Sequence, residues 1–434
     1  MWVSSAWWLF AGRFGRIEGS READDLRDLD RKPLGGAADM NEDTRVGQRI
    51  AYWRNRRGIT QETLAGLVGR SASWLQKVEY GQVAADKVSI LKALANVLKV
   101  ELCDLIGGVN LPANGGAPLD PPQGVPAIRR ALLAVRPPDR EPRLTAELRA
   151  DVGQLKWLKY EGRPETVSVL LPDLIADTRA AVAQDLPGGW WCLAGACQLA
   201  SSIARTVGAV DLAWIAVDRA ISAAQNSGDA WLVSASERHL ASALLREGLW
   251  NDAGAACSDG TDAIAPGDTT PLEGWSVFGS LKLTEADATA RAGDVAGAWR
   301  VLREARVAAE RVGPGRNDYW EAFGPATVSV YEMGVSLEAG DPVEALRIAD
   351  AVEVDDLPSA ESRARSCIYA ARAHAVRRDD AATILQLLEA ERHSPESVRY
   401  QVLVHTLVRA CLSREKRSRT PQLRGLAERL GVAY

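Results

Sequence analysis

Short turns that carry a glycine recur along residues 126–434, and they constrain the fold of this chain more than any other feature. The clearest turns read YEGRPETV, VGAVDLAW, REGLWNDA, RAGDVAGAW and EAGDPVEAL, while a sixth, RRDDAATIL, lacks the glycine. The glycines recur 40 to 47 residues apart, at Gly162, Gly208, Gly248, Gly293 and Gly340. A glycine at a helix C-terminus permits a positive φ, and an aspartate after it can cap the next helix. The pattern therefore predicts stacked helix pairs, an α-solenoid with a concave face.

The segments between these turns have helical periodicity. Apolar residues recur at three- and four-residue spacing, as in Leu281, Leu283, Ala286 and Ala290. Small residues on the helix after RAGDVAGAW allow close approach of two helices, and a larger residue between them fills the groove. We find no convincing strand pattern, so the predicted fold class is all-α.

A Gly- and Pro-rich stretch divides the chain. Residues 107–125 lack hydrophobic periodicity and are predicted to be a linker between a domain at 40–106 and a tetratricopeptide-like repeat domain at 126–434. Residues 1–39 are interpreted either as a disordered arm or as an extension from a start codon upstream of Met40. The domain at 40–106 is basic, with a net charge of about +3 over residues 41–106, whereas the overall charge is −5. A basic module on an acidic body fits a polyanion-binding head.

Residues 47–81 contain two short helices joined by a tight turn. Thr60 is the expected N-cap of the first helix, Gly69 the turn residue, and Ser71 or Ser73 the N-cap of the second helix. The apolar residues expected to pack the two helices together are Leu64, Ala65, Val68, Leu75 and Val78. The second helix then leaves one polar stripe outward, with the width of the DNA major groove, consisting of Ala72, Ser73, Gln76 and Lys77.

These residues resemble the phage-repressor-like, or Xre, family of helix-turn-helix regulators. The matching residues are the Gly-Ile-Thr-Gln entry at 58–61, Leu64-Ala65, Gly69, Ser71 and the Glu-Tyr-Gly exit at 79–81, followed by ILKALANVLKVEL. The resemblance implies a five-helix domain that binds double-stranded operator DNA. It also implies that Gln61 contacts a phosphate and braces the second helix, that Arg70 and Ser71 lie near the DNA backbone, and that Ala72, Ser73 and Lys77 face base edges.

Three positions leave alternatives open. The loop after Gly81 reads QVAADK where the family usually has an arginine and a proline, so Lys87 alone remains for a contact there. Trp74 either packs against one of the two preceding helices, the one that ends at Gly58 or the one that Thr60 caps, or lies over a sugar-phosphate. The basic run at Arg54, Arg56 and Arg57 is either a solvated face or a set of phosphate contacts.

Catalytic and metal motifs are missing from the sequence. The four histidines lie far apart, and the six cysteines are scattered and read as small buried residues of a reducing cytosol. We find no Walker A loop, no dinucleotide site and no nucleophile elbow. We also find no apolar run near the roughly 20 residues that cross a bilayer. We therefore predict a cytoplasmic protein that is not an enzyme and has no cofactor and no metal.

Two functions remain for residues 126–434. One is a sensor that binds a small molecule or a peptide; the other is a scaffold that dimerises or recruits a partner protein. The layout resembles the peptide-pheromone-sensing regulators of Gram-positive bacteria, and the composition suggests an actinobacterial type. Candidate ligand residues cluster where a long turn interrupts the repeat, at Asn317, Asp318, Trp320 and Phe323, although the aromatics also fit an ordinary core and Asn317-Asp318 a helix cap. A homodimer is expected, because one head presents few side chains to the bases.

Overall fold

The computed structural model divides into two compact units, Met1–Ile106 and Gly107–Tyr434, and each is considered by itself. The residues that the structure describes are 46–47, 49–51, 53–54, 57, 59–80, 82–83, 85, 88–98, 100, 105, 122–136, 138–267, 269–415 and 420–432. The interpretations of residues 1–39, of the start at Met40 and of most of the linker at 107–125 fall outside them. The described residues contain helices and no strand, so the all-α prediction is confirmed.

The first unit is built from short helices around one core. Its helices with described bounds are α2 (Gln61–Leu67), α3 (Ala72–Glu79) and α4 (Val88–Leu98). Helical residues at 46–47, 49–51 and 53–54 precede α2. Fully buried side chains from all of these segments meet in the core, including Ile50, Leu64, Leu75, Leu94 and Leu98.

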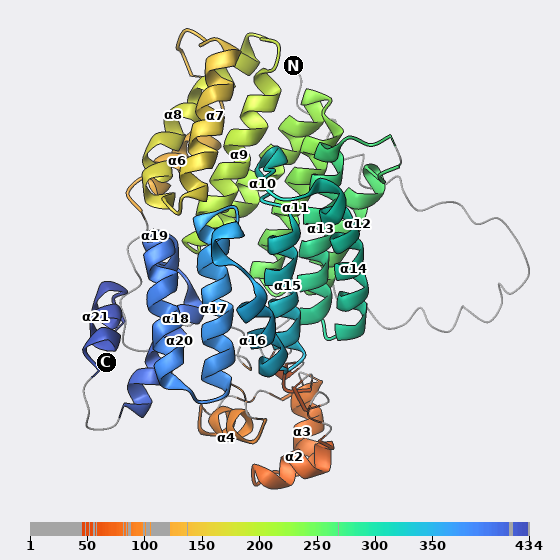
Figure 1. Ribbon diagram of the computed structural model, residues 1–434, viewed down its shortest axis with the longest axis vertical. Coiled ribbons are helices and arrows are strands. Elements are labelled where there is room, and N and C mark those ends of the chain that lie inside the picture. The colour runs from red at the N-terminus through yellow and green to blue at the C-terminus, as the bar shows by residue number, and fades with distance from the viewer. Residues whose placement is uncertain are drawn as a thin grey trace, which may run out of the picture. The chain divides into compact units, whose positions relative to one another are not determined.

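The second unit is a series of helix pairs (Figure 1). Helix α6 (Val125–Leu133) packs against α8 and α10. The pairs that follow are α7 (Thr145–Tyr160) with α8 (Pro164–Ala183), α9 (Gly189–Thr206) with α10 (Val210–Ser227), α11 (Ala230–Arg246) with α12 (Trp250–Ala263), α13 (Leu272–Arg291) with α14 (Val295–Val312), α15 (Pro325–Glu338) with α16 (Pro342–Ala351), and α17 (Ala360–Val376) with α18 (Asp380–His393). The short helix α19 (Pro395–Arg399) and the helices α20 (Val402–Arg414) and α21 (Pro421–Arg429) complete the unit. None of the described helices is both long enough and apolar enough to cross a membrane.

Each of the six predicted turns lies between the two helices of a pair. The five glycines all have φ between +72° and +101°, as a left-handed helix end requires. In the sixth turn, which lacks a glycine, Arg378 adopts φ +62°. The aspartates after three of these turns cap the next helix, since Asp294, Asp341 and Asp379 each accept hydrogen bonds from backbone N–H groups of its first turn. The predicted repeat is thus confirmed turn by turn.

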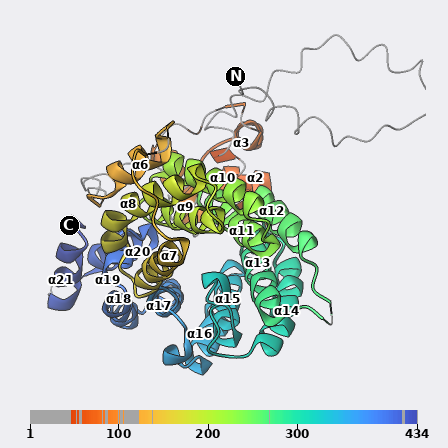
Figure 2. The ribbon, with the colours of Figure 1, turned by 90° about the horizontal axis from the view of Figure 1, so that it is seen from above.

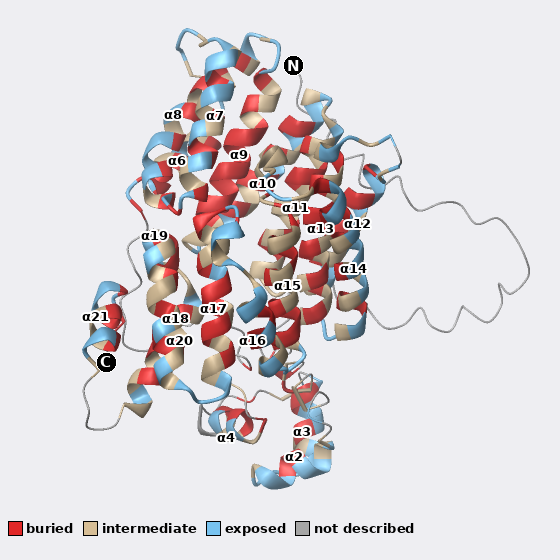
Figure 3. Cartoon of the chain, in the orientation of Figure 1, coloured by how far each residue is buried: buried red, intermediate tan, exposed pale blue. Residues whose placement is uncertain are grey.

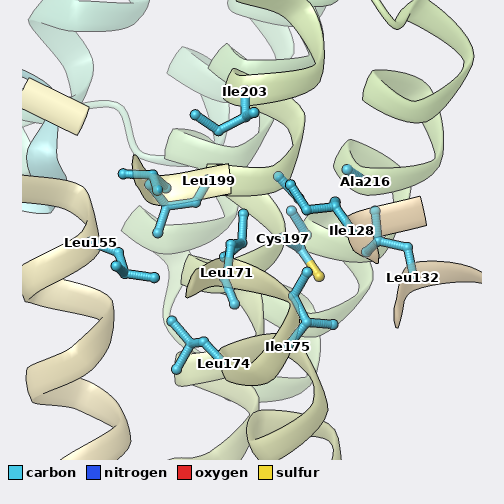
Figure 4. Packing of buried hydrophobic residues seen from close by; sticks show 14 of the residues in the cluster. Ile128, Leu132, Leu155, Leu171, Leu174, Ile175, Cys197, Leu199, Ile203 and Ala216 are labelled. Carbon is cyan, nitrogen blue, oxygen red and sulfur yellow. The ribbon is translucent and has the colours of Figure 1, made fainter. Parts of the chain in front are cut away.

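The core of the second unit runs along the interfaces between successive helices, where buried faces alternate with exposed ones (Figure 3). At the first pairs, Ile128 of α6, Leu155 of α7, Leu171 of α8 and Leu199 of α9 share one apolar cluster (Figure 4). Truncating one such leucine to alanine costs about 2–5 kcal/mol in proteins of this kind. This packing fixes the helices that carry the polar groups described below.

The first helices of successive pairs form the inner layer of the unit. Helices α7, α9, α11, α13, α15 and α17 each pack against the next in this series, and seen end-on they surround a common centre (Figure 2). The series also closes on itself, because the turn between α7 and α8 meets the last pairs. Lys159 forms an ion pair with Glu361 of α17 at 2.6 Å, and the Glu165 N–H donates to Glu396 of α19 at 2.8 Å. The second unit is therefore a closed superhelix rather than an open arc.

Candidate nucleic-acid interface and candidate ligand site

Two side-chain caps define the ends of the helix pair in the first unit. Thr60 accepts a hydrogen bond from the Thr63 N–H at 3.1 Å and caps α2, while Ser71 accepts from the Trp74 N–H at 3.2 Å and caps α3. Of the two serines considered for the second cap, Ser71 is the one used. Between them Gly69 has φ +68° and turns the chain. A side-chain cap at each N-terminus is worth about 1 kcal/mol, so both helix starts are fixed locally.

Small residues allow the helices of this unit to approach closely. Leu64, Ala65, Leu75 and Val78 are all at most 1% exposed, whereas Val68 is half-buried. The Ala65 methyl group is fully buried where α2 meets α3. The preceding helical segment also lies against the α3 backbone, because a Cβ added to Gly47 would lie 1.9 Å from the Val78 carbonyl oxygen. Any side chain at 47 would push that segment away from α3.

The predicted stripe on α3 faces solvent. The residues at the start of α3 and along its outer face are all exposed, namely Arg70, Ser71, Ala72, Ser73, Gln76 and Lys77. Gln61, at the start of α2, is half-buried. The arrangement presents short polar groups and one cation on a single helix face, with the apolar face turned inward, which is the pattern a helix needs to enter the major groove.

A buried carboxylate at the end of α3 ties three helical segments together. The Arg54 guanidinium donates to both oxygens of Glu79, at 2.6 and 2.9 Å, and the Gln61 amide donates to Glu79 Oε2 at 2.6 Å. The Arg54 and Glu79 side chains are only 12% and 5% exposed, and the hydrogen bonds to Glu79 raise the pKa of Arg54. This role of Glu79 was not predicted from the sequence. Its position on the apolar face of α3, four residues after Leu75, was a signal that it needs a cation.

The arginines of the basic run at 54–57 have different roles, which the sequence alone did not distinguish. Arg54 is neither solvated nor free for a phosphate, because it also donates to the Ile59 carbonyl at 3.0 Å. Arg57 is exposed and donates to the Leu98 carbonyl at 3.0 Å. Trp74 is half-buried against the core of the unit, and the Arg70 guanidinium lies 5.5 Å from its ring centroid. Arg56 and Lys87 fall outside the described residues.

Residues 45–105 match the family model described as a helix-turn-helix domain. This segment is a helix-turn-helix domain. The second unit lies outside that match. A solved structure of Bacillus thuringiensis PlcR, in complex with the peptide PapR7 and DNA, aligns with 79% of this chain and 99% of its own, at 10% identity and a TM-score of 0.35. A likeness this distant carries no argument about function. No curated protein matches the sequence.

In the second unit, the segment between α14 and α15 crosses the inner face and is held by its own chain. Asn317 Oδ1 accepts hydrogen bonds from the Tyr160 hydroxyl of α7 at 2.8 Å and from the Ala322 N–H at 3.1 Å. Asp318 receives the Arg316 guanidinium on both oxygens at 2.8 Å. Trp320 packs edge-on against the Tyr160 ring, with centroids 5.8 Å apart. We call residues 313–324, which include the 3-10 helix η1 (Asp318–Trp320), the bridge segment.

Phe323 anchors the bridge segment in the core. Its side chain is 2% exposed, and a Cβ added to Gly279 of α13 would lie 2.0 Å from its ring. Gly279 therefore leaves the space that the phenyl ring fills. The four candidate ligand residues thus share one segment, and their described contacts are with groups of the protein itself: Asn317 and Trp320 contact Tyr160, Asp318 pairs with Arg316, and Phe323 is a core side chain.

Charged side chains gather on the inner layer beside the bridge segment. We call this set the inner cationic cluster; it consists of Lys156, Lys159, Arg205, Arg238 and Arg365. Glu361 pairs with Lys159, and Glu321 of the bridge segment pairs with Arg238. Arg365 donates to the Tyr331 hydroxyl at 3.1 Å. No sequence pattern indicates this cluster, because its members are spread over four helices, α7, α9, α11 and α17, of different repeats.

Burial lowers the pKa of Lys156 and Arg205, which have no ion pair within the described part of the chain, and also that of Lys159, which is paired with Glu361. Lys156 is 6% exposed and donates to Gln198 at 2.8 Å; burial, the largest cause, lowers its pKa to about 8 despite the nearby Glu321. Burial likewise lowers the pKa of Arg205 to about 10, against the attraction of Glu361. A cation whose pKa falls is one whose surroundings do not compensate its charge. Both groups therefore lie where an anion would be favourable.

The described part of the chain contains no assembled site for metal binding or for thiol reactivity. No three described His, Cys, Asp or Glu side chains group as a metal site would need. The described cysteines are buried free thiols, as expected for small core residues: Cys192, Cys197, Cys257, Cys367 and Cys411. Burial raises the pKa of Cys197 to about 12, which disfavours the reactive thiolate.

Proposed function

We propose that the protein is a sequence-specific DNA-binding transcriptional regulator whose helical repeats sense a ligand. The observation that carries the proposal is the exposed polar face of α3 in a helix-turn-helix domain, held rigid from behind by the buried Arg54–Glu79 pair. A helix that reads base edges must keep its orientation, since a bidentate contact fails when its geometry shifts.

In this proposal each residue of the interface has a separate task. Ala72, Ser73 and Lys77 of α3 face base edges, and Arg70 and Ser71, just before the helix, lie near the DNA backbone; all five side chains are exposed. Gln76 belongs to the same outward stripe. Gln61 donates one amide hydrogen to Glu79, and its amide carries a second one that is suited to a phosphate oxygen.

We infer that the working unit is a homodimer on a two-fold-related operator in the cytoplasm. One head offers about four side chains to the bases, at roughly 1–3 kcal/mol of discrimination for each good contact. Two heads on half-sites one helical turn apart double this discrimination, and a symmetric dimer presents them in register.

Sensing, rather than a scaffold role alone, is favoured for the second unit by its inner face. A surface that only recruits a partner protein has no need of buried cations, which destabilise a fold when they lack counter-charges. Such groups are retained where a ligand uses them. A ligand can alter DNA binding only if it binds two arrangements of the protein with different affinities.

The proposal is tested by selecting binding sequences from a random duplex pool with the full chain. The selected site should contain a dyad, the complex should have the mass of a dimer on one duplex by light scattering, and affinity should fall steeply with salt as phosphate contacts release counterions. A pool that yields no enriched sequence would overturn the DNA-binding function. A monomer on a site without a dyad would overturn only the dimer.

A further inference from the structure

The inner cationic cluster contains more positive than negative charge. Its two carboxylates are already occupied, Glu361 by Lys159 and Glu321 by Arg238. Lys156 and Arg205 form no ion pair among the described residues; Lys156 donates instead to the neutral Gln198 amide oxygen. Helices α7 and α11, which carry Lys156 and Arg238, both pack against α9, which carries Arg205. The packing of the inner helices therefore holds these surplus positive charges close together.

Apart from Arg238 Nε, which lies against the Glu321 carboxylate, two nitrogen atoms of this region are buried and have no hydrogen-bond partner among the described residues. They are Nε of Arg205 on α9 and Nδ1 of His239 on α11. The cations around His239, including Arg238, Lys156 and Arg205, add to its burial and lower its pKa well below the usual range. Buried polar atoms in native proteins nearly always have partners, so unpaired atoms next to unpaired charge point to a missing one. Both side chains are half-buried as residues, so they are not sealed into the core.

We propose that the inner face binds a ligand through a carboxylate or phosphate group, with Arg205 as the principal contact and Lys156 and His239 beside it. An oxyanion supplies what all three positions lack: negative charge for the two cations, and an acceptor for Arg205 Nε–H and for His239 in its Nδ1–H tautomer. A guanidinium holds such groups through paired hydrogen bonds, and these charge-assisted bonds are the stronger kind. The inference rests on the proposed sensing role and specifies its ligand chemistry.

The bridge segment lies next to the proposed site and contacts helix α7, which carries Lys156. Glu321 of this segment contributes to the electrostatic surroundings of Lys156, and Asn317 and Trp320 bind Tyr160 one helical turn from Lys156 on α7. An anion that binds Arg205 and Lys156 competes with Glu321 for the same positive charge. Ligand binding is therefore coupled to the position of the bridge segment.

The test uses thermal unfolding of the full chain at constant ionic strength, with inorganic phosphate, acetate and the tripeptide Ala-Ala-Ala as probes. At least one probe should raise the melting temperature saturably, because a ligand that binds the folded state stabilises it by mass action. The Arg205→Gln variant should need about tenfold more probe, or more, for the same rise. The matched control is Arg303→Gln, at an exposed arginine of α14 that forms no ion pair with a described residue; this variant should respond like the wild type.

The arms of the experiment separate the sources of the anion. A rise in melting temperature with phosphate alone assigns a phosphate ligand. A rise with acetate and with the tripeptide assigns a carboxylate ligand. If amidation of the tripeptide abolishes the rise, its terminal carboxylate is the contact. If Arg205→Gln does not fold, Lys156→Gln is the second variant. No rise with any probe, or equal responses from Arg205→Gln and Arg303→Gln, would overturn the inference. No DNA is present in this assay, so its failure is independent of a failure to bind an operator.

Discussion

The carboxylate of Glu79, at the end of α3, is held on both oxygens by the guanidinium of Arg54, 25 residues earlier in the chain. Gln61 of α2 shares the same carboxylate. The exposed face of α3 is thus fixed through the buried end of the helix. The arrangement separates the exposed side chains of α3 from the buried groups that orient the helix.

Replacement of Arg54 by methionine should destabilise the helix-turn-helix domain by about 3–5 kcal/mol, because Glu79 would remain buried without its cation. Amide hydrogen exchange of α3 in the full chain measures this directly. The exposed Arg70→Met change is the matched control and should leave exchange in α3 nearly unchanged. Equal protection in both variants would show that the pair does not hold α3.

Truncation of Lys77 to alanine should weaken binding to the selected operator by about 1–3 kcal/mol and relax the preference at one base pair. Competition binding with single-base variants of the operator gives both quantities. Lys92→Ala, an exposed lysine on α4, serves as the control for loss of one positive charge. If specific and random DNA lose affinity equally, Lys77 contacts the backbone and not a base.

Lys156 should make stability depend on pH in the alkaline range. Its pKa is about 8 in the folded chain against 10.5 for an ordinary lysine, so the folded state loses this proton first. Between about pH 8 and 10.5 the unfolded state binds more protons, and stability from this group therefore rises with pH. The melting temperature of the wild type, measured relative to that of Lys156→Met, should rise with pH across this range. Below pH 8 the difference between the two melting temperatures should stay constant. A constant offset would contradict the assignment.

The ion pair between Lys159 and Glu361 should couple the first and last repeats. Both side chains are largely buried, at 18% and 23% exposure. A double-mutant cycle with Lys159→Met and Glu361→Gln should give an interaction energy of about 0.5–3 kcal/mol by chemical denaturation. The exposed pair Arg347–Glu344 within α16 is the comparison and should give less than about 1 kcal/mol. Additive effects of the two substitutions at 159 and 361 would show that this contact does not hold the superhelix closed.

Gly279→Ala should destabilise the second unit by about 1–3 kcal/mol, because the new methyl group would lie 2.0 Å from the Phe323 ring. The helical Gly254 of α12 has open space around its Cβ position, so Gly254→Ala should be neutral or slightly stabilising. Adding Phe323→Leu to Gly279→Ala should recover part of the loss in melting temperature. An unchanged loss would show that the ring is not what the methyl group meets.

The features that the sequence predicted well are those encoded within a few residues. The turn glycines, the aspartate caps and the caps at Thr60 and Ser71 each depend on neighbours three or four positions away. The outward stripe of α3 followed from the period of its apolar residues. Local chemistry of this kind determines helix ends and faces before any tertiary contact forms.

The contacts that the sequence did not reveal join distant segments. Lys159 and Glu361 are 202 residues apart, and they meet only because small rotations between repeats accumulate to a full turn. The Phe323 ring fills the space beside Gly279, and a fit of this kind leaves no periodic pattern in the sequence. The aromatic cluster at 319–323 therefore looked like a ligand site in the sequence, although Phe323 belongs to the core.

The contact of the α7–α8 turn with α17 and α19 has a mechanical consequence. An open solenoid can stretch or bend in small increments, and its end repeats can unfold while the middle stays intact. In this unit the first pair is braced by α17 and α19, so it cannot move without straining contacts at both ends of the series. A displacement of a helix on the inner layer must then either be absorbed locally or be passed on in both directions around the ring.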